Sequence, residues 1–169
     1  MTRSAAIAVL LVLGWGCGGG AEPKSEPKSD PKPVALKVEG RPELMPAKLA
    51  DPEAEHILVA HVLVSFAGTK TKATRGQAAA ERLAYEVLAK ARKGDDFNKL
   101  IRDFSDDEGE GVYGLANHRI SPVGTEYERR KMVPAFGDVG FKLEAGSIGM
   151  SVFDAQKSPY GWHIIKRLK

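Results

Sequence analysis

Prolines and aromatic residues are distributed very unevenly along this 169-residue chain. Seven of the ten prolines fall between Gly18 and Pro52, whereas eleven of the twelve aromatic residues lie at Phe66 or later. A stretch with frequent prolines, mixed charges and no aromatic residue cannot bury enough apolar surface to fold, and it favours extended, polyproline-like conformers. We therefore expect residues 17–52 to form a disordered tether and residues 53–169 to form one globular domain.

The first 16 residues have the pattern of a secretory signal peptide. A basic start is followed by the apolar run Ala5 to Leu13 and then by small residues before Cys17, the only cysteine. The run is too short for a stop-transfer span, and small residues before a cysteine are typical of bacterial lipoprotein processing. We expect residues 1–16 to be removed and Cys17 to be lipidated, which would anchor the protein in the bacterial cell envelope, on the periplasmic side of the outer membrane. Simple secretion or an unmodified cysteine is the alternative, because Gly14 and Trp15 depart from the usual lipoprotein sequence.

Strand-like segments lie at both ends of the expected domain and enclose the helical ones. Alternating or β-branched apolar residues predict strands over residues 55–66, 112–115, 148–153 and 162–168, and helical spacing predicts helices over residues 77–93, from Asp95 or Asp96 to Phe104, and from Pro134 to Gly146. This order indicates an α+β domain with a twisted, mainly antiparallel sheet of about four strands and surrounding helices, mostly on one face. We expect the two terminal strands to be neighbours in the sheet. The polar segment from Asn117 to Lys131 shows little periodicity.

Each terminal strand carries one histidine in an apolar run. The two runs are Ala60-His61-Val62-Leu63-Val64 and Trp162-His163-Ile164-Ile165. A single histidine in such a strand is usually a hydrogen-bonded core residue. If the two rings lie side by side, however, an N–H of one can bond to the lone pair of the other, which fixes both tautomers and keeps the pair neutral. A metal site is the alternative; because no further ligands stand at a recognised spacing, we expect no metal.

Carboxylates and a flexible apolar pair could complete one small site with the histidines. Asp106 and Asp107 follow directly after the predicted helix that ends at Phe104. One carboxylate can therefore turn inward, although most acidic pairs in loops only solvate a turn. Met132 and Phe136 are four residues apart and can share a helix face. A thioether beside an aromatic ring suits a shallow pocket for a compact apolar ring, whereas core packing is the simpler interpretation.

Several segments, in order and spacing, resemble the parvulin (PpiC-type rotamase) peptidyl-prolyl isomerases. They are Ala60 to Val64, Phe104 to Asp107, Met132 to Leu143, Gly146 to Ile148 and Tyr160 to Ile165. The resemblance covers residues 55–169, and the final Tyr-Gly-x-His-Ile-Ile block together with Met-x-x-x-Phe is quite specific. It implies a parvulin/FKBP-like sheet and peptidyl-prolyl cis-trans isomerase activity.

The resemblance also implies roles for individual residues. His61 and His163 match the paired histidines of the family, and Asp107 matches the cysteine-or-aspartate position beside them. The resemblance further implies a pocket that receives the substrate's proline ring, formed by Leu115, Met132 and Phe136.

Three features leave alternatives open. The family's Gly-Gly-Asp-Leu-Gly segment appears here as Gly111-Val112-Tyr113-Gly114-Leu115, and residues 116–131 add a polar stretch that could lengthen a loop over the pocket rim or decorate the surface. His56 also precedes an apolar run and competes with His61 for the first histidine role. We prefer His61, because its segment directly precedes the basic loop.

The function implied is a cofactor-free isomerase that assists the folding of exported proteins. Its partners would be proline-containing unfolded or extended polypeptides and, through the N-terminal lipid, a membrane; we expect a monomer. A catalytically inactive parvulin-like chaperone or peptide-binding module is the alternative, because the same apolar groove could hold extended chains.

The charge pattern adds little evidence for other partners. The net charge is +3, and no basic stripe interleaved with stacking aromatic residues is present, so we expect no nucleic-acid binding. The loop residues Lys70, Lys72 and Arg75 could recognise an acidic or phosphorylated residue before the proline, or they could form an ordinary solvated loop.

Overall fold

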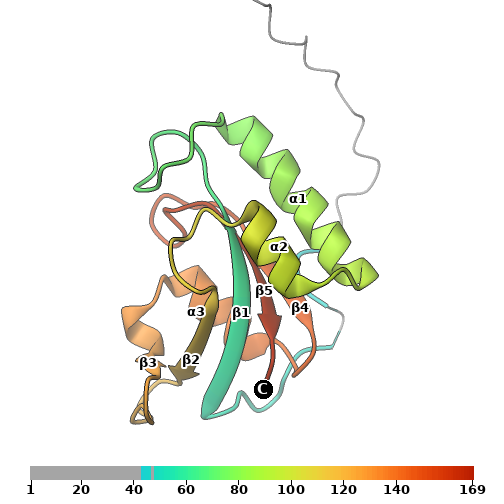
Figure 1. Ribbon diagram of the computed structural model, residues 1–169. Helices are drawn as coiled ribbons and strands as arrows, with labels where there is room; N and C mark the ends of the chain where they lie inside the picture. The colour runs from blue at the N-terminus through green and yellow to red at the C-terminus, as the bar shows by residue number, and fades with distance from the viewer. Residues whose placement is uncertain (1–42, 47) are drawn as a thin grey trace, which may run out of the picture. The chain divides into compact units, whose positions relative to one another are not determined.

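The computed structural model describes residues 43–46 and 48–169. The predicted signal peptide, Cys17 and most of the predicted tether lie outside the described residues. Within the described part, the elements follow one another as β1 (His56–Val64), α1 (Gln77–Lys93), α2 (Phe97–Phe104), β2 (Val112–Ala116), β3 (Tyr127–Glu128), the 3-10 helix η1 (Arg129–Lys131), α3 (Pro134–Lys142), β4 (Ile148–Ser151) and β5 (Trp162–Arg167) (Figure 1).

The strands form one sheet in the order β3-β2-β1-β5-β4. Strand β1 pairs antiparallel with both β2 and β5, and β4 pairs antiparallel with β5. The expected α+β fold and the expected pairing of the terminal strands are therefore confirmed. The sheet has five strands where about four were expected. The additional β3 is only two residues long and pairs parallel with β2, too short a segment for any periodicity to predict.

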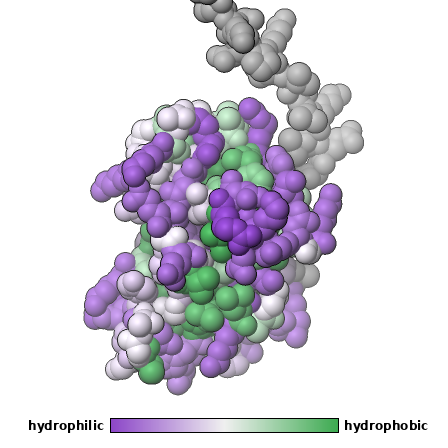
Figure 2. Space-filling view, in the orientation of Figure 1, coloured by the Kyte–Doolittle hydropathy of each residue, from purple (hydrophilic) through white to green (hydrophobic). Residues whose placement is uncertain are grey.

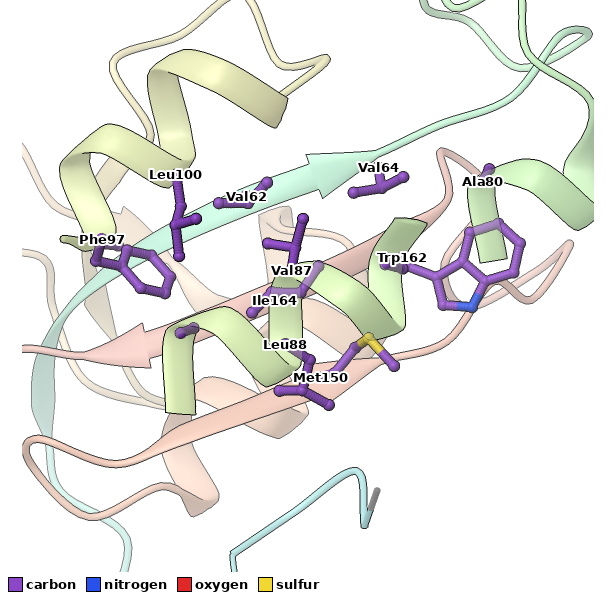
Figure 3. Packing of buried hydrophobic residues seen from close by; sticks show 13 residues of the cluster. Val62, Val64, Ala80, Val87, Leu88, Phe97, Leu100, Met150, Trp162 and Ile164 are labelled. Atoms are coloured by element: carbon purple, nitrogen blue, oxygen red, sulfur yellow. The ribbon is translucent and has the colours of Figure 1, made fainter. Parts of the chain in front are cut away.

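Helices cover both faces of the sheet. Helices α1 and α2 pack on one face over a cluster that includes Val62, Met150 and Ile164 (Figure 3), while α3 packs on the other face through Phe136 and Phe141. Side chains alternate between the faces along each strand, so β1 contributes to both clusters. His61 and His163 lie on the α3 face, because their strand positions alternate with Val62 and Ile164.

Local signals position three helix ends as the sequence predicts, whereas α3, which was expected to reach Gly146, ends at Lys142. Gly94 ends α1 in the left-handed conformation, with φ 97°, and its N–H bonds to carbonyl groups of the last turn. The Asp96 side chain accepts hydrogen bonds from the N–H groups of Asn98 and Lys99 at the start of α2. Pro134 begins α3, where its missing N–H removes no helical bond.

Residues 43–46 and 48–50 lie against the edge of the sheet formed by β4. The Met150 N–H donates to the Leu44 carbonyl at 2.8 Å, and the Ala50 N–H donates to the Lys142 carbonyl at 2.8 Å. The side chains of Leu44 and Met45 pack against the two core clusters. This segment therefore covers the open edge of β4.

The surface is mostly polar on the face shown in Figure 2, with an apolar patch beside α2. Leu58 of β1 and Val112 of β2 belong to the sheet face on which α2 packs, and they are 36% and 39% exposed. None of the helices in residues 43–46 and 48–169 is long and apolar enough to cross a bilayer.

Candidate active site

A cavity of about 610 Å³ opens on the α3 face of the sheet. Its residues come from strands, loops and the start of α3, and they are His61, Leu63, Lys70, Thr71, Lys72, Ser105, Asp106, Asp107, Glu108, Tyr113, Met132, Val133, Phe136, Tyr160 and His163. Because the strands β2, β1 and β5 are adjacent, Tyr113, His61 and His163 project from neighbouring strands to this one hollow.

The two histidines lie with their rings nearly parallel at the base of the cavity. Their ring planes are inclined by 21°, their centroids are 5.5 Å apart, and the two Nδ1 atoms are separated by 3.4 Å. Each residue is only 4% exposed. One proton between the two Nδ1 atoms satisfies both nitrogens, whereas two protons would repel each other. The geometry therefore couples the protonation of the two rings.

Asp107 extends this pair into a longer polar row. Its Oδ2 atom lies 2.9 Å from His61 Nε2 and 2.7 Å from the hydroxyl of Tyr113, which donates to it. The hydrogen bond from His61 holds the pKa of the Asp107 carboxyl well below its ordinary value, and the Tyr113 bond acts in the same direction. Asp107 is therefore an ionised acceptor, and His61 Nε2 carries a proton toward it.

The far end of the row is buried against β4. Burial and the neighbouring His61 lower the pKa of His163 to about 3, so this ring is neutral at physiological pH. Ser151 lies opposite His163 in the register of β4 and β5. Ser151 Oγ and His163 Nε2 are both buried, and neither has a hydrogen-bond partner among the described residues. The Ser151 hydroxyl is thus the polar group of β4 that lies closest to His163 in the strand register.

The acidic turn after α2 is bonded to the end of β1. The Asp106 N–H donates to the Leu63 carbonyl at 2.8 Å, and the Ser65 N–H donates to Asp106 Oδ2 at 2.8 Å. Arg75 also binds Asp106 Oδ2 and donates to the Ser65 carbonyl at 2.9 Å. Asp106 therefore holds the turn against β1 through these bonds, whereas the Asp107 carboxylate bonds to His61.

An aromatic and aliphatic wall stands beside the polar row. The Phe136 ring is 2% exposed and lies edge-on to His61 at 5.0 Å and to His163 at 5.6 Å between centroids. Met132 and Val133 precede Pro134, the first residue of α3, and line the same hollow. The start of α3 thus provides an apolar surface directly beside the imidazoles.

Comparison with known proteins identifies the family. A family model described as the PPIC-type PPIase domain matches residues 47–169, which is most of the chain. The chain belongs to the parvulin family of PPIC-type isomerase domains. The resemblance inferred from the sequence is thereby confirmed.

Curated relatives of this parvulin domain carry the names of folding factors. The chain is 37% identical over 86 residues to "Foldase protein PrsA" of Geobacillus kaustophilus, a match over 51% of this chain and 27% of that protein. It is 28% identical over 114 residues to "Chaperone SurA" of Pseudomonas fluorescens, over 68% of this chain and 23% of that protein. The matches thus span only about a quarter of the length of these relatives.

A solved structure supports the fold. The solution structure of TbPIN1 matches 69% of this chain and 99% of its own, with a TM-score of 0.52 and 22% sequence identity. At this identity the likeness concerns the fold alone.

The parvulin domain brings five of the six predicted site residues of its folded part to the cavity. His61, Asp107, His163, Met132 and Phe136 all line it. Leu115 does not: it is fully buried in the core cluster that also contains Phe136.

Tyr113, two residues before Leu115 on the same face of β2, lines the cavity instead. We did not single out Tyr113 from the sequence. Strand alternation could have found it, because it shares the face of Leu115 on a strand next to the one that carries His61.

The competing histidine lies elsewhere. His56, the first residue of β1, bonds through Nδ1 to Glu126 at 2.7 Å and does not line the cavity. Its position at the start of the strand separates it from His163, so His61 is the histidine that forms the pair.

The basic loop is largely occupied by internal ion pairs. Arg75 binds Asp106, and the Lys72 ammonium lies 2.6 Å from the Glu108 carboxylate. Lys70 is therefore the loop cation that lines the cavity without such a pair in the described residues. In the part of the chain that the structure describes, no three histidine, cysteine, aspartate or glutamate side chains are grouped to hold a metal ion.

Proposed function

We propose that this domain catalyses the cis-trans isomerisation of X-Pro bonds in unfolded or extended polypeptides. The observation that supports it most directly is the coupled pair of His61 and His163, joined to Asp107, at the base of a cavity with an apolar wall. A cavity of about 610 Å³ is large enough for a proline ring and its flanking amides.

The reaction changes no covalent bond. Rotation about an X-Pro amide crosses a barrier of about 18 to 20 kcal/mol, because the resonance that keeps the amide planar is lost. A catalyst must bind the twisted amide more tightly than either planar form. An acceleration of about ten-thousand-fold requires about 5 to 6 kcal/mol of that preference.

Different residues of the cavity bind the proline ring and stabilise the twisted amide. Met132 and Phe136 hold the proline ring, and Leu115 supports Phe136 from the core. The apolar wall also favours the twisted amide, since loss of resonance reduces the charge separation that water stabilises in the planar forms. Asp107, His61 and His163 form a fixed polar row that faces the rotating amide, and neither histidine acts as a nucleophile.

We further propose that the domain works in the cell envelope. The support is the signal-peptide pattern before Cys17 and the Pro-rich stretch of residues 17–52, together with relatives named as a foldase and a chaperone. A lipid on Cys17 would hold the protein at the periplasmic side of a membrane, while the tether lets the domain reach exported clients. Metabolic labelling with a palmitate analogue tests this proposal, because label that persists after Cys17→Ser excludes the assigned lipid site.

A peptide-binding module without catalysis is the second candidate. The name "Chaperone SurA" of one relative favours it, and so does the departure of residues 111–115 from the family's glycine segment. The 3.4 Å separation of the histidine nitrogens and the presence of both Met132 and Phe136 in the cavity lining favour the isomerase.

An exchange assay on short X-Pro peptides distinguishes the two candidates. We expect the wild-type chain to accelerate interconversion, and His61→Ala and Met132→Ala to lower kcat/KM by at least about tenfold. His56→Ala is the matched control, because it removes a histidine of the same strand outside the cavity. If a folded wild-type chain binds the peptides without accelerating their interconversion, the domain is a peptide-binding module and not an isomerase.

A further inference from the structure

Tyr113 lines the cavity, and the proposed mechanism gives it no role. It lies on β2 opposite Val59, on the strand next to the one that carries His61. Its ring centroid is 5.3 Å from that of His61 and 6.1 Å from that of Phe136, edge-on in both cases. The ring therefore continues the apolar wall that Phe136 begins, at the opposite end of the polar row from His163.

The hydroxyl of Tyr113 is joined to the polar row itself. It donates to Asp107 Oδ2 at 2.7 Å, the same oxygen atom that lies 2.9 Å from His61 Nε2. Two donors on one carboxylate oxygen restrict the carboxylate more than one donor does. Burial and the bond to Asp107 raise the pKa of Tyr113, which keeps the phenol protonated as a donor.

The turn before β2 is built to admit this hydroxyl. A Cβ at Gly109 would lie 2.5 Å from the Tyr113 hydroxyl oxygen and 3.4 Å from Asp107 Oδ2. Glycine is therefore needed at position 109 for the tyrosine to reach the carboxylate without displacing it. The Gly109 N–H also donates to Asp107 Oδ1 at 3.4 Å, so the same turn contacts the other oxygen of the carboxylate.

We propose that Tyr113 is a further binding and positioning residue of this site. Its ring contacts the proline ring of the substrate, and its hydroxyl positions the Asp107 carboxylate on His61. This inference rests on the proposed isomerase function. It also separates two contributions of one side chain, because Tyr113→Phe removes the hydroxyl alone and Tyr113→Leu removes the ring as well.

The experiment compares these two variants with the wild-type chain. Tyr127→Phe is the matched control, since that ring lies 6.0 Å from Tyr113, is 52% exposed and does not line the cavity. For each protein we would measure peptide affinity by NMR titration, kcat and KM by exchange NMR, and the imidazole ¹⁵N shifts of His61, which report which nitrogen carries the proton.

Tyr113→Phe is expected to bind peptide as the wild type does, to lose about three- to tenfold in kcat, and to shift the His61 ¹⁵N resonances. Tyr113→Leu is expected to weaken peptide binding by about three- to tenfold in addition. The control should match the wild type in every measurement.

Two results would overturn the inference. The first is a Tyr113→Phe protein with wild-type kcat and unchanged His61 resonances, and the second is a folded Tyr113→Leu protein with wild-type peptide affinity. A wild-type chain without catalysis would instead overturn the proposed function, and in that case the affinity and the ¹⁵N shifts would still decide whether Tyr113 binds peptide and positions Asp107.

Discussion

Burial determines the charge state of His163. The side chain is 4% exposed, and its pKa is lowered to about 3 from an ordinary value of 6.5. Between these pH values the unfolded chain binds a proton at this residue that the folded protein does not bind. The free energy of unfolding must therefore fall as the pH is lowered through this range. The neutral state of His163 in the polar row consequently depends on its burial in an intact core.

Urea unfolding at several pH values tests this linkage. We expect stability to fall between about pH 6.5 and pH 4.5, with a contribution from His163 of up to about 1.4 kcal/mol per pH unit. His163→Asn removes this contribution and should flatten the profile. Asp107 does not contribute to the slope over this pH range. Its pKa is lowered from 3.8, so its contribution to stability is lost only below that pH. Equal slopes in the two proteins over this range would contradict the assignment.

At the scale of elements, the acidic turn and the start of β5 are both docked on the end of β1. The Ser65 hydroxyl donates to the Tyr160 carbonyl at 2.5 Å, and Gly161 follows with φ 139°. A Cβ at Gly161 would lie 2.2 Å from the Val64 carbonyl oxygen, so only glycine permits this approach. On the other side, Arg75 ties Asp106 to Ser65. These contacts bring His163 and Asp107 to His61 from segments far apart in the sequence.

Arg75 is expected to act on catalysis through the acidic turn. Arg75→Gln removes the charge that holds Asp106, loosens Asp107, and should lower kcat by about tenfold with a smaller change in KM. Lys48→Gln is the control: its ion pair with Glu144 is exposed, lies outside the cavity and contributes little. The same peptide exchange assay measures both. Equal kinetics for the two variants would show that the Arg75 contact does not position the turn.

At the scale of the whole molecule, the packed unit includes residues that precede the expected domain start at residue 53. Leu44 and Met45 contact the core clusters on either face, and Arg92 of α1 donates to the Glu43 carbonyl at 2.6 Å. The Met45 sulfur lies 2.9 Å from the position that a Cβ on Gly149 would take, so β4 accommodates this segment closely. The segment thus ties the end of the Pro-rich stretch to the sheet.

Two shortened chains measure this contribution. A chain that begins at residue 53 is expected to be less stable than one that begins at residue 43 by about 2 to 4 kcal/mol, because it loses two packed apolar side chains and two backbone hydrogen bonds. Denaturant unfolding of both chains gives the difference. Matching midpoints would mean that the contacts of Leu44 and Met45 do not stabilise the domain.

Local patterns were sufficient for most of the elements. Apolar periodicity, the caps Gly94 and Asp96 and the first-turn Pro134 each act over a few residues, and they predicted α1, α2, α3 and four of the strands. Strand β3 was not predicted, because it forms only through its pairing with β2. The residues next to it in the sequence do not encode that pairing.

The sequence by itself determined the family, the α+β fold and the residue types of the candidate site, since these follow from motif order and local periodicity. Tertiary structure decided which of several equivalent residues face the cavity. Asp107 and not Asp106 meets the histidines because Arg75 and the β1 backbone bind Asp106. Tyr113 and not Leu115 lines the hollow because the core under Phe136 buries Leu115. Such choices depend on contacts between distant segments, whose geometry exists only once the sheet has formed.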